Sequence, residues 1–248
     1  MSTAAIVVIG NEVLSAKVLD ENGPFLAREL RALGVEVRRI ETVPDEVPLI
    51  VDALRRCLGA AQWVFTSGGI GPTHDDVTIA AVASAFGRRT VVDERTLSLL
   101  LARYGDQLKP ALRRLAEVPE GATLTWGPGP GPSYPVLMLD NVVILPGVPS
   151  LLREGFFRVR DRFRGPPIFS CTVFLSLGEG ALAEHLDATV ARFPAVAIGS
   201  YPRFATPEDP APAYRVKVTF DGRGEAEVKL AAAFFVARLP DGAVLPEE

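Results

Sequence analysis

The chain has 248 residues, 48% of them hydrophobic, so it can bury a sizeable core and has room for one large or two modest domains. Its formal net charge of −4 argues against a nucleic-acid surface, which would normally carry a basic stripe. The two cysteines lack CxxC spacing and no apolar stretch approaches a membrane span, which argues against a disulfide framework, a zinc site and a membrane protein. We expect a cytoplasmic protein, since the N-terminal apolar run is too short for a signal sequence.

The first part of the chain alternates short apolar runs with amphipathic stretches. This pattern predicts strands at residues 5–10, 35–43 and 62–66, and helices at residues 24–33 and 45–58. Strands that alternate with helices indicate βαβ units and a mainly parallel sheet covered on both faces. Ligands of such sheets bind at the carboxyl ends of the strands. The loops after Ile9, Val43 and Phe65 are therefore expected to share one edge.

The most informative segment is TSGGIGPTHDDVT at residues 66–78. Gly68, Gly69 and Gly71 follow the third strand and free the backbone to turn sharply and approach a ligand closely. A helical pattern is expected from Asp76 onwards, so the residues before it lie near a helix N-terminus, where unpaired N–H groups favour anions. The segment therefore predicts a phosphate site, although it is neither a P-loop nor a GxGxxG motif.

Asp75 and Asp76 would repel a phosphate unless a cation lay between them, and Mg²⁺ is the natural mediator. The alternative is that Asp75 caps the next helix and Asp76 stabilises its first turn. His74 is a candidate acid, metal ligand or phosphate partner at this polar turn. Ser67 and Thr73 can donate to phosphate oxygens or bond their own backbone. Neither has a triad-like partner, which disfavours covalent catalysis.

Two further aspartates leave alternatives open. Asp45 lies between a strand and a helix, so on sequence alone it is equally well an N-cap or a catalytic group. Asp20 could position a ligand or cap the helix that begins near Pro24.

Residues 93–115 have a helical pattern broken at Gly105 and Pro110, and the Gly- and Pro-rich segment at 126–135 predicts a loop. Residues 136–139 and 142–145 are expected to pair as strands through a turn, and Pro149 to begin a helix that runs through Arg162.

Residues 165–167 are typical of a linker, and we place the domain boundary there, giving domains at 1–165 and 166–248. Beyond it the expected order is strand, helix, strand, strand, helix, strand, with an exposed loop at 206–212. That β-α-β-β-α-β order predicts a ferredoxin-like α+β domain.

Several motifs together resemble a known family. They are GNEVLSAKVLDEN at 10–22, VPDEV at 43–47, SGGIGPTHDDVT at 67–78 and ILPGVPSLL at 144–152. The chain resembles the molybdopterin-binding-like domain of molybdopterin adenylyltransferases, CinA-like proteins and the N-terminal half of animal FAD synthases. GSYP at 199–202 and ARLPDG at 237–242 extend the similarity to the FAD synthases. The resemblance implies a three-layer α/β/α sandwich for the first domain.

The resemblance also implies a site and an activity. In these relatives the domain is associated with metal-dependent hydrolysis of the diphosphate of FAD or ADP-ribose, which releases AMP. It implies a divalent metal (Mg, Mn or Co), a nucleotide or pterin as small-molecule partner, and allows a homo-oligomer. Asp45, Asp75 and Asp76 would be the catalytic and metal positions. The implied substrate positions are Gly10, Glu12, Asn22, Ser67, Gly68, Gly69, Gly71, Thr73, His74, Thr78, Pro146 and Gly147.

The chain departs from the family at two points. Asn11 stands where relatives usually carry Asp, and the second catalytic domain of FAD synthases and CinA-like proteins is absent, which argues against FAD synthesis and nucleotide deamidation. The alternatives to hydrolysis are molybdopterin binding or adenylyl transfer, and a non-catalytic nucleotide-binding module.

Overall fold

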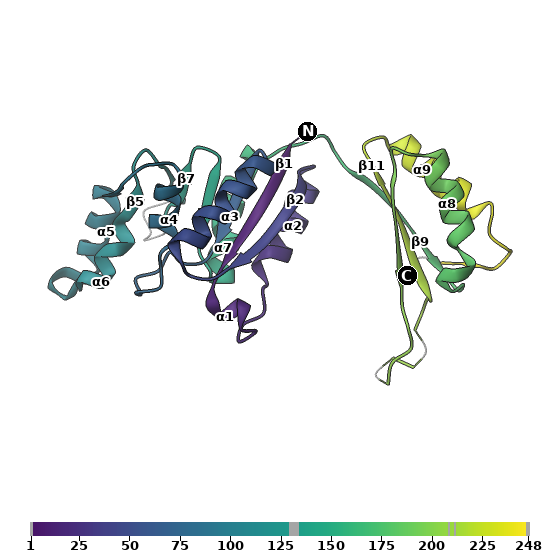
Figure 1. Ribbon diagram of the computed structural model, residues 1–248, viewed down its shortest axis with the longest axis horizontal. Coiled ribbons are helices and arrows are strands. Elements are labelled where there is room, and N and C mark those ends of the chain that lie inside the picture. Colours follow the sequence, from purple (N-terminus) through teal and green to yellow (C-terminus); the bar gives the residue numbers. More distant parts are fainter. Residues whose placement is uncertain (1, 129–133, 208, 211, 247–248) are drawn as a thin grey trace. The chain divides into compact units, whose positions relative to one another are not determined.

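A computed structural model of the chain describes residues 2–128, 134–207, 209–210 and 212–246. The chain divides into two compact units, Met1–Pro166 and Pro167–Glu248, and each is described by itself (Figure 1). Parts of the loops expected at 126–135 and 206–212 fall outside the described residues. Within the described residues, no helix combines the length and apolar character needed to cross a membrane.

The first unit is built on a six-stranded sheet with the order β2-β1-β3-β8-β7-β6. Strands β2 (Glu36–Val43), β1 (Thr3–Ile9), β3 (Trp63–Ser67) and β8 (Val142–Leu145) pair in parallel. Strand β7 (Val136–Leu139) runs antiparallel to β8, and β6 (Thr123–Thr125) runs antiparallel to β7. Ile9 pairs with Val43, and Ser67 pairs with both Val8 and Leu145. This register brings the carboxyl ends of all four parallel strands, and the loops that follow them, to one edge.

Helices cover both faces of this sheet, as the sequence predicts. Helices α3 (Val47–Ala60) and α4 (Thr78–Ala85) cover one face, and α2 (Asn22–Ala32) and α7 (Pro149–Val159) the other. Strand β1 alternates its side chains between the two cores and is buried on both sides. The expected three-layer α/β/α architecture is confirmed, and its layering leaves only the strand-end loops free to form a site.

An insertion between α4 and β6 forms a small lobe of its own. Its order is β4 (Thr90–Val92), α5 (Glu94–Tyr104), a 3₁₀ turn (Gly105–Gln107), α6 (Pro110–Arg113), a second 3₁₀ turn (Arg114–Ala116) and β5 (Glu117–Pro119). Strands β4 and β5 pair antiparallel. The helix breaks expected at Gly105 and Pro110 are confirmed. The three-residue strands β4, β5 and β6 were not predicted, because such short runs carry no clear period.

The second unit contains β9 (Phe169–Leu175), a 3₁₀ turn (Glu179–Ala181), α8 (Ala183–Arg192), β10 (Ala197–Pro202), β11 (Val216–Gly222), α9 (Glu225–Val236) and β12 (Val244–Leu245). Its antiparallel sheet has the order β10-β11-β9-β12, with α8 and α9 on one face (Figure 1). The ferredoxin-like arrangement expected for this part of the chain is confirmed.

Several elements differ from the sequence prediction, and some of these differences affect the site. Helix α3 begins at Val47 and α4 at Thr78, so Asp45, Asp75 and Asp76 all precede their helices. A short helix, α1 (Asn11–Leu14), follows β1 where only a loop was expected. In the helix predicted from Pro149 to Arg162, the last three residues form a 3₁₀ turn. The two candidate carboxylates after β3 therefore belong to a turn.

Candidate active site

The loop that follows β3 is shaped by two glycines with positive φ, 104° at Gly68 and 65° at Gly69. A Cβ at Gly68 would lie 2.2 Å from the carbonyl oxygen of Ile9, and one at Gly69 would lie 2.3 Å from Oγ1 of Thr78. The N–H of Gly68 donates to the carbonyl of Leu145 at 3.1 Å. The loop is thus pressed between the ends of β1 and β8, where only glycine fits.

Thr78, the first residue of α4, holds this loop in place through two hydrogen bonds. Its hydroxyl donates to the carbonyl of Gly68 at 2.8 Å, and its N–H donates to the carbonyl of Gly69 at 2.9 Å. Its side chain is fully buried. Thr78 therefore fixes the loop and does not line the pocket described below.

Asn22, at the start of α2, ties the ends of two neighbouring strands together. Its Nδ2 donates to Oγ of Ser67 at 2.9 Å and to the carbonyl of Gly147 at 2.7 Å. Its Oδ1 is buried without a hydrogen-bond partner among the described residues. Asp20 accepts from the N–H groups of Asn22 and Gly23 at 3.0 and 2.9 Å, which makes it a cap of α2.

The carboxylate of Asp76 is the acceptor around which the next turn closes. It accepts hydrogen bonds from the N–H of Gly71 at 2.6 Å, from the N–H of Thr73 at 2.8 Å and from the Thr73 hydroxyl. From the inserted lobe, Arg114 donates to the carbonyls of Thr73 at 2.8 Å and Asp76 at 3.1 Å. Asp76 and Arg114 therefore hold the turn from opposite sides. Asp76 does not stabilise the first turn of α4, one of the two alternatives raised above.

Asp75 and His74 lie on the exposed side of this turn, outside the pocket. Asp75 accepts from the Thr73 hydroxyl at 2.6 Å, and that bond, together with a backbone N–H and the nearby His74, holds the pKa of Asp75 below its ordinary value. The His74 side chain is 96% exposed, and its Nδ1 lies 3.9 Å from Oδ1 of Asp75. Neither residue caps α4, whose N-cap is Val77. Asp75, His74 and Thr73 do not line the pocket.

Asp45 is neither the N-cap of α3, which is Glu46, nor a pocket residue. Its Oδ2 accepts the N–H of Asn11 at 2.8 Å, at the first residue of α1. An acceptor at a helix N-terminus satisfies one of its free N–H groups. Asp45 therefore connects the loop after β2 to the loop after β1, and Gly10 completes that link through its N–H to the carbonyl of Val43 at 3.1 Å.

The expected convergence of Asp45, Asp75 and Asp76 on one cation is not seen. Among the described residues, the structure brings together no group of three or more His, Cys, Asp or Glu side chains suited to a metal ion. Asp45 faces α1 while Asp76 serves its own turn, which explains the separation. Asp75 and Asp76 remain neighbours through the shared Thr73 hydroxyl. The described residues thus contain no such cluster, and the metal stays a prediction.

At this edge of the sheet lies a pocket of about 1060 Å³. We call one part of it the glycine end, formed by the loop after β3, the start of α1 and the turn before α7. Its lining residues are Glu12, Gly68, Gly69, Ile70, Gly71, Asp76, Pro146, Gly147 and Val148. Among the described residues, the N–H groups of Gly69 and Ile70 have no acceptor. Together with the N-terminus of α7, they can receive an anion.

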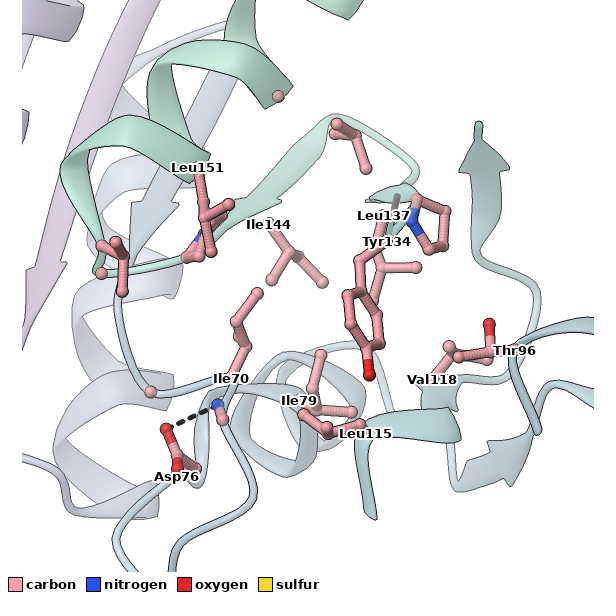
Figure 2. A pocket seen from close by; sticks show the side chains of 18 of the residues that line it. Ile70, Asp76, Ile79, Thr96, Leu115, Val118, Tyr134, Leu137, Ile144 and Leu151 are labelled. Atoms are coloured by element: carbon pink, nitrogen blue, oxygen red, sulfur yellow. Dashed lines mark hydrogen bonds between the residues drawn. The ribbon is translucent and has the colours of Figure 1, made fainter. Parts of the chain in front are cut away.

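The opposite part, which we call the apolar end, lies between α4, the inserted lobe and β7. Its main lining residues are Ile79, Leu115, Val118, Tyr134 and Leu137, as Figure 2 shows. Three arginines, Arg103, Arg114 and Arg158, also line the pocket. An apolar chamber with a few polar groups at one side is the usual form of a small-molecule site.

The structure therefore brings together seven of the residues singled out from the sequence, namely Glu12, Gly68, Gly69, Gly71, Asp76, Pro146 and Gly147. Gly10, Asn22, Ser67 and Thr78 hold the loops without lining the pocket. Sequence reasoning missed the apolar end and the three arginines. The available signal was the Gly- and Pro-rich segment at 126–135, which contains Tyr134, because such a run is unusual in a packed core.

Comparisons with known proteins agree with this fold. Residues 5–163 match the family described as "Probable molybdopterin binding domain", and residues 167–248 match "FAD synthase, middle domain". These matches confirm the resemblance stated from the motifs, and they fall on the two units of the structure.

Two relatives illustrate the extent of the similarity. A protein of Archaeoglobus fulgidus is 32% identical over 237 residues, covering 95% of this chain and 97% of its own length. A "Probable FAD synthase" of Caenorhabditis elegans is 34% identical over 227 residues, covering 81% of this chain and 44% of its own length. The chain thus spans nearly all of the archaeal relative and under half of the worm protein.

Among solved structures, the protein CinA from Thermoplasma acidophilum, described as of unknown function, matches with a TM-score of 0.60 and 30% identity. The match covers 65% of this chain and 98% of that one. The names among the relatives support a function connected with nucleotide cofactors.

Proposed function

We propose that this chain, which belongs to the family of probable molybdopterin-binding domains, hydrolyses the diphosphate bond of a nucleotide cofactor and releases AMP. The observation that carries the proposal is the composition of one pocket. Its glycine end offers unpaired N–H groups to an anion, and its apolar end offers space for a flat ring. A nucleotide cofactor has both chemistries in one molecule.

The phosphate groups would lie at the glycine end. The N–H groups of Gly69 and Ile70 and the N-terminus of α7 provide donors there without a folding change, since the loop is already fixed by Thr78 and Asn22. Arg103 and Arg114 add positive charge on the side of the inserted lobe. Together these groups stabilise the negative charge that develops on phosphate oxygens during hydrolysis.

Glu12 is the carboxylate we propose as general base. It lines the glycine end, and its carboxylate forms no hydrogen bond or ion pair with any described residue, whereas the Asp76 oxygens already accept three hydrogen bonds. The water oxygen bonds to phosphorus, the bridging P–O bond breaks and Glu12 accepts the proton of the water. The products are AMP and the second phosphate-bearing fragment.

The proposal includes a divalent ion that enters with the substrate. Mg²⁺ commonly binds through one or two carboxylates plus substrate phosphates, and Asp75 and Asp76 are the adjacent pair that suits this mode. Such an ion would neutralise phosphate charge. Asp45 contributes indirectly, because its bond to Asn11 orients the short helix that carries Glu12.

The test is release of AMP from FAD, ADP-ribose and NAD by the purified chain, with Mg²⁺, Mn²⁺ or Co²⁺ and with chelator. We expect metal-dependent cleavage of at least one compound and a loss of about 100-fold or more in kcat for Glu12→Gln. The matched control is Glu46→Gln, an exposed glutamate outside the pocket. No AMP from any compound with any metal would overturn the proposal.

Asp45 separates a positioning role from a catalytic one. Asp45→Asn keeps an oxygen acceptor for the Asn11 N–H, so it should retain most activity, whereas Asp45→Ala should lose it. Equal loss in both variants would indicate that the charge of Asp45 itself is required.

The family match favours one second candidate, adenylyl transfer to a pterin. A transferase would form an adenylylated pterin and pyrophosphate from ATP and molybdopterin, whereas a hydrolase acting on ATP would form AMP and pyrophosphate and leave the pterin unchanged. Incubation with both compounds and analysis of the products by mass spectrometry distinguishes the two. Binding of nucleotide without any product would favour the non-catalytic module.

A further inference from the structure

The Gly- and Pro-rich segment that follows β6 is anchored on both sides of its central residues. At its start, the guanidinium of Arg95 lies 4.0 Å from the ring centre of Trp126. At its end, Arg158 donates to the carbonyl of Tyr134 at 2.8 Å. The Arg158 side chain is only 10% exposed and also binds Glu154 at 2.6 Å. The backbone of Tyr134 is therefore held by a largely buried, paired arginine.

Tyr134 also lines the pocket. Figure 2 shows the ring between Leu137 and the side chains of Ile79, Leu115 and Val118. Partial burial raises the pKa of the Tyr134 hydroxyl, which stays neutral near pH 7. The residue nevertheless remains 44% exposed, so part of the ring is accessible from the cavity.

We infer that Tyr134 is a specificity-determining residue, whose ring stacks on the planar heteroaromatic ring of a ligand that carries its phosphate to the glycine end. The inference rests on the proposed function for the class of ligand, and it assigns the ring of that ligand to the apolar end. Tyr134 thereby selects nucleotide-like compounds with an accessible flat ring over phosphate compounds that lack such a ring.

The chemistry of the apolar end supports a flat ring in particular. Ribose hydroxyls placed against Ile79, Val118 and Leu137 would lose water without gaining hydrogen bonds. A flat heteroaromatic ring loses less hydration free energy when it enters the apolar end, and it gains dispersion and stacking with tyrosine. Stacking of a base on an aromatic side chain is sequence-tolerant, so flavin and adenine share this chemistry and need separate tests.

The experiment measures binding without turnover. Quenching of FMN fluorescence reports a flavin ring, calorimetry with AMP reports adenine, and competition by inorganic pyrophosphate reports the glycine end alone. The variants are Tyr134→Phe, Tyr134→Leu and Tyr134→Ala. Tyr201→Ala, which removes an exposed tyrosine of the second unit, is the matched control.

We expect Tyr134→Ala to weaken binding of FMN, AMP or both by about 5- to 150-fold, the range for removal of one stacking ring. Tyr134→Phe should bind normally, Tyr134→Leu should bind weakly, and pyrophosphate should bind equally to all variants. Loss for FMN alone or AMP alone identifies the stacked ring as flavin or adenine.

Unchanged binding of both FMN and AMP in Tyr134→Ala would overturn the inference, as would full binding by Tyr134→Leu or an equal loss for pyrophosphate. The proposed function fails separately. If ring binding depends on Tyr134 but no AMP is released, hydrolysis is contradicted and the stacking proposal stands. If AMP is released equally well by the Tyr134 variants, hydrolysis stands and the stacking proposal is contradicted.

Discussion

The two ends of the pocket are built in different ways. The glycine end comes mainly from a single run of residues, 68–76, fixed by hydrogen bonds to Asp76, Thr78 and Arg114. The apolar end takes its side chains from α4, the inserted lobe and β7, which are separated by long stretches of sequence. One end therefore depends on backbone geometry, and the other on the packing of side chains from separate elements.

This difference predicts different responses to mutation. A change in the glycine end should disturb the backbone and act on folding and binding together. A change in the apolar end should alter ligand choice and leave the backbone in place. The following variants test that distinction, from the largest expected effect to the smallest.

Gly68→Ala should have the largest effect. The added Cβ would meet the carbonyl oxygen of Ile9 at 2.2 Å, at a φ of 104°, so the ends of β1 and β3 must separate. We expect a loss of about 3 kcal/mol or more in the free energy of unfolding, together with loss of nucleotide binding. Urea denaturation and calorimetry measure the two.

Gly87→Ala is the matched control for Gly68→Ala. Gly87 also has a positive φ, 63°, but a Cβ there has nothing within 4 Å. Gly87→Ala should lower the free energy of unfolding by about 1–2 kcal/mol, because alanine is strained in the left-handed conformation, and it should leave nucleotide binding unchanged. Equal costs at the two glycines would show that the close contact between β1 and β3 is unimportant.

Asp76→Ala should come next. It leaves the N–H groups of Gly71 and Thr73 without their acceptor, and we expect a loss of about 1–3 kcal/mol in the free energy of unfolding and weaker nucleotide binding. Asp75→Ala removes a neighbouring exposed carboxylate and should leave stability unchanged. If Asp75→Ala proved equally destabilising, the turn would not depend on Asp76 in particular.

Arg114 connects the inserted lobe to the glycine end, so Arg114→Ala tests whether the two ends are coupled. We expect a loss of about 1 kcal/mol in stability, because two hydrogen bonds to the carbonyls of Thr73 and Asp76 disappear. In a double-mutant cycle with Asp76→Ala, the energies should be non-additive by at least about 0.5 kcal/mol. Arg113→Ala, at the neighbouring exposed residue, is the control. Strict additivity of the energies in the cycle would indicate that the two ends are independent.

Cys57, in α3, belongs to neither end of the pocket and should have the smallest effect near neutral pH. Burial raises the pKa of its thiol to about 11, above the ordinary value of about 9. The folded state therefore holds the proton more tightly, and its contribution to stability is complete below pH 9 and is lost as the pH rises towards 11. Denaturation across this window should show the loss, and Cys57→Ala should remove it without changing nucleotide affinity.

The fold was predictable because its signals are local and repeated. Mainly apolar runs followed directly by a glycine or proline mark β1, β3 and β8, and their alternation with amphipathic helices already implies a parallel sheet. In the site, Gly68, Gly69 and Gly71 were found because sharp turns require glycine. The starts of α3 and α4 were placed two residues too early, since a carboxylate before an apolar run is typical of both a cap and a turn.

The roles of the carboxylates were not predictable. Asp45 and Asp76 look alike in sequence, each between a strand and a helix, yet Asp45 accepts from Asn11 and Asp76 accepts from Gly71 and Thr73. The donor to Asp45 is set by which loops the sheet register brings together, and no local pattern contains that information. The donors to Asp76 lie within its own turn, but a carboxylate before a helix is equally typical of a helix cap.

By itself, the sequence determined that this chain forms a parallel α/β unit with a glycine turn after its third strand, followed by a ferredoxin-like unit. Such features depend on the period of hydrophobic residues and on backbone freedom, which neighbouring residues decide. Only the tertiary structure decided that Ile79, Val118 and Tyr134 meet in one chamber and that Arg114 reaches the turn of Asp76. Those contacts join residues distant in the chain, and they exist because the folded sheet and the inserted lobe bring them within contact distance.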